Sequence, residues 1–442
     1  MLQDCLLEQA TLAADQANWS LLLQYLPQLL AKENPTQNKL NNLTENHQQN
    51  LLNWALQILE NGDFQERWEI AKIIPNFGTN SLETLIEIIQ DEDCDTELRW
   101  FASRILAEFN CPQVIETLVN VLKTSQEAEL NAMAANALAN MGTEAIEALT
   151  GLLSDEESRL FAVKSLTQIR HPQIIEPLLK IVKDPHPDIR SLAIEALYSF
   201  HDISSIPVLI EALNDPSAIV RKEATIGIGL CLDLITPEES VKLLKNRLWD
   251  FNLDVCREAA SALAKIKTPA AAEALFDILK SPSTPEILQI EIVRSLGWMA
   301  TPEALEYLAQ TLFSETQKTS CQPTLTKEII AVLGRIQNPN LSPQIAKTLS
   351  QTLHSKSPLL QNSTIKSTLA LALGQLKNKN ALQSIINLLS DSDESVRLHA
   401  IAAIKQIIGP STTKTLELLT QKPLNPAFHQ EIILALQEIP IA

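Results

Sequence analysis

Apolar residues repeat along most of the chain with a period of about 31 residues, the length of a helical repeat. Each period contains one anchor position, most often arginine, and the third, seventh and tenth residues after it are apolar; the seventh is always Leu or Ile. These offsets lie on one stripe of a helix with 3.6 residues per turn. The pattern predicts that a helix follows each anchor and buries this stripe. The anchors are Arg67, Arg99, Asn131, Arg159, Arg190, Arg221, Cys256, Gln289, Thr326, Lys366, Arg397 and His429.

A second apolar pattern precedes each anchor. Ile175, Leu178, Leu179 and Val182 follow the i, i+3, i+4, i+7 spacing of an amphipathic helix, and the same spacing recurs in other periods. Each period is therefore predicted to be a pair of antiparallel helices, too small to bury its apolar face alone. Stacked pairs share one extended core, so the pattern predicts an all-α superhelix of about twelve helical-hairpin repeats.

A short polar motif separates the two helices of a pair. An Asp stands six residues before the anchor Arg in DPHPDIR (184–190), DPSAIVR (215–221), DSDESVR (391–397) and DCDTELR (93–99). Asp caps helix starts, and Pro supplies a suitable φ for the first helical residue. The motif thus marks where the second helix of each pair begins.

With this motif, residues 46–442 resemble the HEAT-repeat family, and most closely its short repeats of phycobilisome-lyase type. The resemblance implies an α-solenoid of armadillo-like superhelical form. It also implies that the recurrent Asp and Arg form a hydrogen-bonded ladder between repeats. Asp93/Arg99, Asp184/Arg190, Asp215/Arg221 and Asp391/Arg397 are then structural residues.

Residues 1–45 do not follow the repeat. Two Leu-rich helices are expected there, at about 2–14 and 18–31, followed by a polar, Asn- and Gln-rich linker at 32–50. We expect 1–45 to form an N-terminal cap and linker, and 46–442 to form the solenoid. Two longer periods predict loops at 314–324 and 353–362.

Composition narrows the function. The net charge of −18 argues against a surface that binds nucleic acid or anionic lipid as a whole, and aromatic residues make up only 4% of the chain. No apolar run approaches the ~20 residues of a membrane span, so membrane insertion is not expected. The six cysteines are scattered, and the first residues lack the basic start of a secretory signal. These features predict a cytoplasmic protein.

Catalytic motifs are missing from the sequence. No phosphate-binding loop or nucleophile elbow occurs, and none of the seven histidines is followed by Glu, as the iron-binding His-Glu pairs of the HEAT-like enzyme deoxyhypusine hydroxylase would require. His171 and His201 end adjacent repeats, but two imidazoles are too few for a metal site. We expect no cofactor and no metal.

The most economical hypothesis is a non-catalytic scaffold or adaptor that binds a protein partner on the concave face. The resemblance leaves an alternative open: a bilin lyase or isomerase, or another phycobilisome-associated factor, acting on a phycobiliprotein. An assembly chaperone is a third possibility. Whether the chain is an enzyme therefore stays undecided at this point.

A candidate partner site follows from the helix geometry. Residues one, five and eight positions after the anchor point away from the buried stripe. They include Trp68 and Lys72 in one repeat, Trp100 and Arg104 in the next, and Lys164 further along. Tryptophan with arginine is typical of binding hot spots, and a planar acidic bilin would suit the same pair. The competing interpretation is that the N-terminal cap covers both rings.

A second candidate site is a basic stretch. No Asp or Glu occurs between Ile329 and Ser390. This local positive charge would attract an acidic protein partner, although lysines on an ordinary solvated surface explain it equally well. Nucleic acid is not the expected partner, because no aromatic residues alternate with the lysines. The patch comprises Arg335, Lys347, Lys366, Lys377 and Lys379.

Overall fold

The computed structural model describes residues 2–30, 44–317 and 322–409. These residues form 24 α-helices joined by short turns and 3-10 segments, with no strand among them. The predicted all-α fold is confirmed. The twelfth anchor, His429, and the predicted linker between residues 31 and 43 lie outside the described residues.

The chain divides into two compact units, residues 1–200 (unit 1) and residues 201–442 (unit 2). The helices of unit 1 are α1 (Leu2–Asp15), α2 (Trp19–Leu30), α3 (Glu45–Asn61), α4 (Phe64–Ala71), α5 (Leu82–Gln90), α6 (Thr96–Leu106), α7 (Pro112–Thr124), α8 (Ala128–Asn140), α9 (Ile146–Leu152), α10 (Arg159–Gln168), α11 (Ile175–Ile181) and α12 (Pro187–Ser199). Those of unit 2 are α13 (Ile206–Ala212), α14 (Ala218–Leu230), α15 (Pro237–Lys245), α16 (Leu253–Ile266), α17 (Pro269–Leu279), α18 (Glu286–Met299), α19 (Pro302–Gln317), α20 (Pro323–Arg335), α21 (Ser342–Leu353), α22 (Ser363–Gln375), α23 (Leu382–Ile386) and α24 (Glu394–Ile408).

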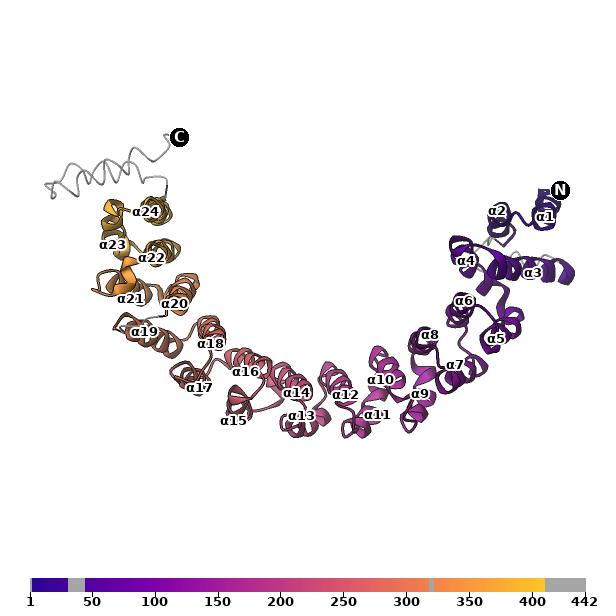
Figure 1. Cartoon of the computed structure of the whole chain (residues 1–442), viewed down its shortest axis with the longest axis horizontal. Coiled ribbons are helices and arrows are strands. Elements are labelled where there is room, and N and C mark those ends of the chain that lie inside the picture. Colours follow the sequence, from indigo (N-terminus) through magenta and orange to yellow (C-terminus); the bar gives the residue numbers. More distant parts are fainter. Residues whose placement is uncertain (1, 31–43, 318–321, 410–442) are drawn as a thin grey trace. The chain divides into compact units, whose positions relative to one another are not determined.

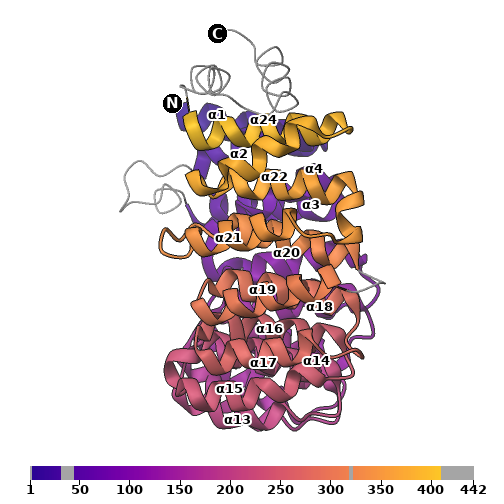
Figure 2. The ribbon, with the colours of Figure 1, turned by 90° about the vertical axis from the view of Figure 1, so that its left-hand side faces the viewer.

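Within each unit the helices form two layers, as the pattern predicts. Even-numbered helices, the second of each pair, form one layer along the inner side of the unit's curve, and odd-numbered helices form the outer layer (Figure 1). In Figure 2, α20, α22 and α24 lie one above another in this manner. From α4 to α24, the anchor is the fourth residue of every second helix except α10, where it is the first.

The predicted boundaries are mostly right. The two helices expected at 2–14 and 18–31 are α1 and α2. The polar linker expected up to residue 50 ends earlier, because α3 begins at Glu45 with the Thr44 hydroxyl accepting a hydrogen bond from the backbone of His47. The 353–362 loop contains a 3-10 turn, Pro358–Gln361, while α19 runs on to Gln317 into the other predicted loop.

The anchors form the expected ladder. Within a repeat, the anchor side chain donates to the carbonyl six residues upstream: Arg221 Nη1 to Asp215 at 2.8 Å, and Arg397 Nη1 to Asp391 at 2.9 Å. Between repeats, the anchor pairs with the next repeat's carboxylate, so that Arg221 binds both oxygens of Asp250 at 2.7 and 2.8 Å. Where the anchor is a long basic side chain paired in this way, the ladder joins one repeat to the turn of the next.

Smaller anchors keep part of this arrangement. Asn131 Nδ2 donates to the Ser125 carbonyl at 3.0 Å, and the Cys256 thiol to the Asp250 carbonyl at 3.2 Å, again six residues upstream. The assignment of Asp93 to the ladder was wrong, because Arg99 binds the Ile89 carbonyl and the Glu127 carboxylate. The Asp93 side chain is exposed.

Glycines let second helices approach one another. A Cβ added at Gly229 in α14 would stand 2.7 Å from the Cβ of Ala262 in α16. Gly229 lies eight residues after its anchor, an offset expected to point away from the buried stripe to an open surface. That expectation was wrong: this offset faces the next second helix.

We predict that Gly229→Ala lowers the free energy of unfolding of unit 2 by about 1–3 kcal/mol through overpacking, less what the better helix propensity of alanine returns. Adding Ala262→Gly, which moves the methyl group from one helix to the other, should restore most of the loss. A double-mutant cycle of urea unfolding measures the coupling between the two sites. Additive effects in that cycle would contradict the contact.

Candidate partner-binding site

The structure brings Trp68, Trp100 and Arg104 together on the second-helix face of unit 1. Trp68 is on α4 and Trp100 is on the neighbouring second helix, α6. Arg104 lies one turn after Trp100, and its guanidinium carbon is 4.0 Å from the centroid of the Trp68 ring and 6.0 Å from that of Trp100. Both rings are partly exposed and Arg104 is exposed. One arginine therefore stacks between repeats on two tryptophans, at a distance suited to cation–π attraction.

Two phenylalanines complete the cluster, and the sequence argument missed both. Phe64, the first residue of α4, lies 6.2 Å from Trp68 between ring centroids and 5.5 Å from Phe101. Phe101 is fully buried and meets Trp100 edge to face at 4.9 Å. Phe64 is 55% exposed. Its position three residues before the anchor is the only sequence signal that could have indicated it.

The two other predicted cations differ in their surroundings. Lys72 lies 6.0 Å from the Trp68 ring centroid but also pairs with Glu69 at 2.8 Å, which partly balances its charge. Lys164, on α10, is not part of the cluster. It lines a separate groove of about 840 Å³ with Arg170, Leu192 and others.

The two arginines at the cluster, Arg67 and Arg104, differ in whether acidic side chains neutralise them. The anchor below it, Arg67, is bound by Asp95 and Glu97, each at 3.2 Å. In the described part of the chain no carboxylate pairs with Arg104. Its positive charge is therefore available to an acidic group, and the tryptophan faces restrict its orientation.

The N-terminal helices leave the site open as far as they are described. α2 packs beside α4, where the Ser20 hydroxyl donates to Glu66 at 2.8 Å. Trp68 and Trp100 nevertheless keep part of their surface exposed. The described portion of residues 1–45 thus does not bury both rings.

The predicted basic patch is dispersed. Lys366 is the anchor of its repeat, and its ammonium pairs with Asp391 at 2.5 Å as a rung of the ladder. Arg335 and Lys377 are exposed at the C-terminal ends of α20 and α22, whereas Lys347 is exposed on an outer-layer helix. Lys379, also exposed, begins the turn before α23. Lys366 therefore cannot serve as a free surface cation.

The two rim histidines have local partners. The ring of His171 accepts a hydrogen bond from the backbone of Gln173, and His201 Nε2 lies 2.8 Å from Asp233. Within the described ranges, no three His, Cys, Asp or Glu side chains gather closely enough to hold a metal ion. None of the helices described there is long and apolar enough to cross a membrane.

Comparison with protein families identifies the class. The pattern of HEAT repeats matches residues 82–160, 153–229, 206–292, 241–319 and 358–437, which together cover more than half of the chain. The protein belongs to the HEAT-repeat family. No curated protein gives a significant sequence match.

Solved structures agree on the fold. Kap121p bound to the extreme C-terminus of the protein phosphatase Cdc14p is 12% identical with a TM-score of 0.57, over 98% of this chain and 53% of that one. Importin beta in a polyethylene glycol condition is 14% identical with a TM-score of 0.52, over 98% of this chain and 70% of that one. The chain spans about half the length of Kap121p. At such identities the likeness concerns the fold alone.

Proposed function

We propose that this HEAT-repeat protein is a non-catalytic adaptor, and that it binds an acidic protein segment at Trp68, Trp100 and Arg104. The observation that carries the proposal is the stacking of Arg104 on two partly exposed tryptophans from adjacent repeats. Exposed tryptophan is costly unless it is used, and Trp and Arg dominate binding hot spots. A carboxylate on the partner would pair with Arg104, while an apolar side chain beside it would pack on Phe64 and Trp100.

Other features support an adaptor. Kap121p, which has a similar fold, has been crystallised bound to the extreme C-terminus of Cdc14p and bound to Pho4p. The long second-helix layer offers further contacts, including the groove beside Lys164.

The site can be tested by paired substitutions. Trp68→Ala with Trp100→Ala should abolish capture of the partner from native lysate, and Arg104→Glu should do so without removing a ring. Trp298→Ala is the matched control, because Trp298 is 58% exposed in unit 2 and also carries a cation, Lys267, 4.8 Å from its ring centroid. Quantitative mass spectrometry of the captured proteins measures the effect.

Two results would count against the proposal. If wild type and Arg104→Glu captured the partner equally, Arg104 would not be part of a binding site. If the double variant had a much lower helical melting temperature, the two tryptophan rings would be core residues and not binding residues. The bilin alternative has its own measurement. If mixing with the protein shifted the absorption spectrum of free bilin, and the double variant did not cause this shift, the ligand of the site would be a tetrapyrrole and not a protein segment.

A further inference from the structure

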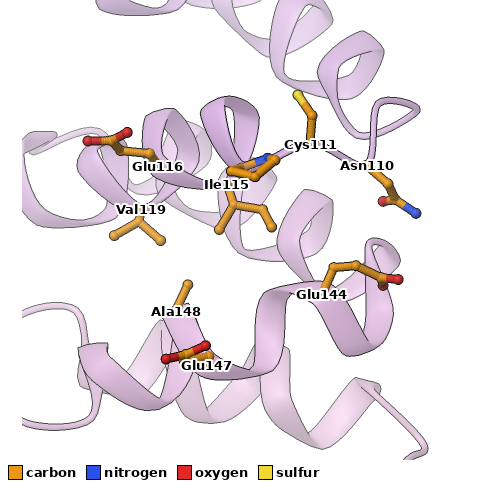
Figure 3. Close-up of a pocket in the computed structure, with 9 residues that line it drawn as sticks. Asn110, Cys111, Ile115, Glu116, Val119, Glu144, Glu147 and Ala148 are labelled. Carbon is orange, nitrogen blue, oxygen red and sulfur yellow. The ribbon is translucent and has the colours of Figure 1, made fainter.

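An apolar groove opens on the outer layer of unit 1, on the side opposite the tryptophan cluster. It lies between α7 and α9 and has a volume of about 610 Å³. Ile115 and Val119 point across it towards Ala148 (Figure 3). Glu116, Glu144 and Glu147 line it as well, and all three are exposed. The groove therefore has an apolar floor and an acidic rim.

The equivalent place in unit 2 is closed by aromatic rings. Val119 is the eighth residue of α7 and Phe276 the eighth residue of α17, and each helix begins with proline. Ala148 precedes the buried Leu149 of α9 as Tyr307 precedes the buried Leu308 of α19. Phe276 and Tyr307 stack with centroids 4.3 Å apart and planes within 9°. Small residues at the same two positions leave the groove of unit 1 open.

The acidic rim is the same in both places. Glu273 and Glu306 occupy the positions of Glu116 and Glu147. Glu116 and Glu273 lie three residues before Val119 and Phe276, and Glu147 and Glu306 immediately precede Ala148 and Tyr307. Burial and, after it, the negative charges of Glu273 and Glu306 raise the pKa of the Tyr307 hydroxyl. The two carboxylates therefore lie close enough to the stacked rings to affect them electrostatically. In the described residues of unit 1 no cation pairs with Glu116 or Glu147. The negative potential there is left without a partner from the chain itself.

We propose that the α7–α9 groove docks a basic segment of a protein partner, which inserts one aliphatic side chain between Val119 and Ala148. Lysines or arginines flanking that side chain pair with Glu116 and Glu147. An aliphatic side chain fills the space that Phe276 and Tyr307 fill in unit 2, and the flanking cations match the rim. This site is independent of the tryptophan cluster, which attracts the opposite charge.

Two labelled peptides test the proposal on the full chain. The probes are GSKRLKRSG and GSKRGKRSG, which differ only in the central leucine. The wild type should bind the leucine peptide at least about tenfold more tightly, the effect expected from burying one leucine side chain. Ala148→Phe should remove this preference, whereas Ala148→Ser should retain it. Glu116→Gln with Glu147→Gln should weaken both peptides and reduce the salt dependence of binding.

A local readout fixes the position of binding. Cys111 lines the groove and is partly exposed, so the leucine peptide should slow its alkylation as followed by mass spectrometry, with Cys94, which lies outside the groove, as the internal reference. Equal affinity of the wild type for the two peptides would overturn the proposal, because binding would then depend on the charges of the peptide alone and not on the leucine side chain. So would a leucine preference that survives in Ala148→Phe, or Cys111 alkylation that the peptide leaves unchanged.

Phe276→Val with Tyr307→Ala provides a test by gain of binding. This variant gives unit 2 an open apolar gap behind the same acidic rim, and it should bind a second leucine peptide per chain. The stoichiometry is measured by isothermal titration. A folded variant that still binds one peptide would show that the two filling residues do not control access, which would overturn the proposal.

Discussion

Asp250→Ala should lower the free energy of unfolding of unit 2 by about 3–5 kcal/mol, the cost of breaking a buried ion pair by removing one partner. The Asp250 side chain is only 4% exposed and accepts both Nε and Nη2 hydrogen bonds of Arg221. It also accepts from the backbone of Asn252 at 2.9 Å. Its removal leaves the Arg221 guanidinium with hydrogen bonds to the carbonyls of Asp215 and Pro216 and with the charge of Asp215.

Asp254, in the first turn of the helix α16 that follows Asp250, provides a control for this prediction. Asp254 lies 3.6 Å from Arg257, but both side chains are about half exposed, so Asp254→Ala should change stability by no more than about 1 kcal/mol. Urea unfolding followed by circular dichroism measures both variants. Because repeat arrays need not unfold in one step, hydrogen exchange of α14 and α16 should confirm that the loss is local. Similar effects of the two substitutions would contradict a special role for the ladder.

The Asp250–Arg221 pair also makes the free energy of unfolding depend on pH in the acidic range. Burial by itself raises the pKa of Asp250, but hydrogen bonds from Arg221 and Asn252 and the charges of Arg221 and Arg247 outweigh it and hold the pKa below its ordinary value. A lowered folded pKa contributes stability above the unfolded pKa of about 3.9, and this contribution is lost as the pH falls through the folded pKa. The stability gap between wild type and Asp250→Asn should therefore narrow below pH of about 4. A gap that stays constant in acid would contradict this account.

Leu197→Ala should cost about 2–5 kcal/mol, since it empties space in the core of the repeat. Leu197 is the seventh residue after Arg190, on the predicted buried stripe, and its side chain is fully buried. The loss should appear as faster hydrogen exchange in α11 and α12, which form one pair, and as a lower thermal midpoint.

Leu398→Ala is the matched substitution. Leu398 follows its anchor by one residue and is 50% exposed, so its truncation should leave the midpoint nearly unchanged. Equal losses at the two leucines would mean that the stripe does not separate core from surface. The comparison tests the repeat register without reference to any partner.

The periodicity of apolar residues in the sequence predicts most of the fold of this protein. The offsets of three, seven and ten residues placed Leu197 and its equivalents in the core, because a repeat that stacks on identical neighbours must bury the same stripe each time. The offset of five residues also held for Lys72, Arg104 and Lys164, which are exposed. It failed at the offset of eight, where Gly229 meets Ala262, because the angle around one helix does not say how closely the next helix approaches.

The candidate sites depend on contacts between repeats. The sequence by itself determined the class of fold, the repeat register, the anchor positions and the adjacency of Trp68 and Trp100. Only the tertiary structure decided that Arg104 reaches the Trp68 ring of the preceding repeat and that Phe64 joins the cluster. It likewise decided that Lys366 forms an ion pair with Asp391. It also decided that Val119 and Ala148 leave a groove where Phe276 and Tyr307 close one. The physical reason is that helix periodicity sets which side of a helix a residue occupies, whereas side-chain volume and reach across the gap to the next helix set what that residue touches.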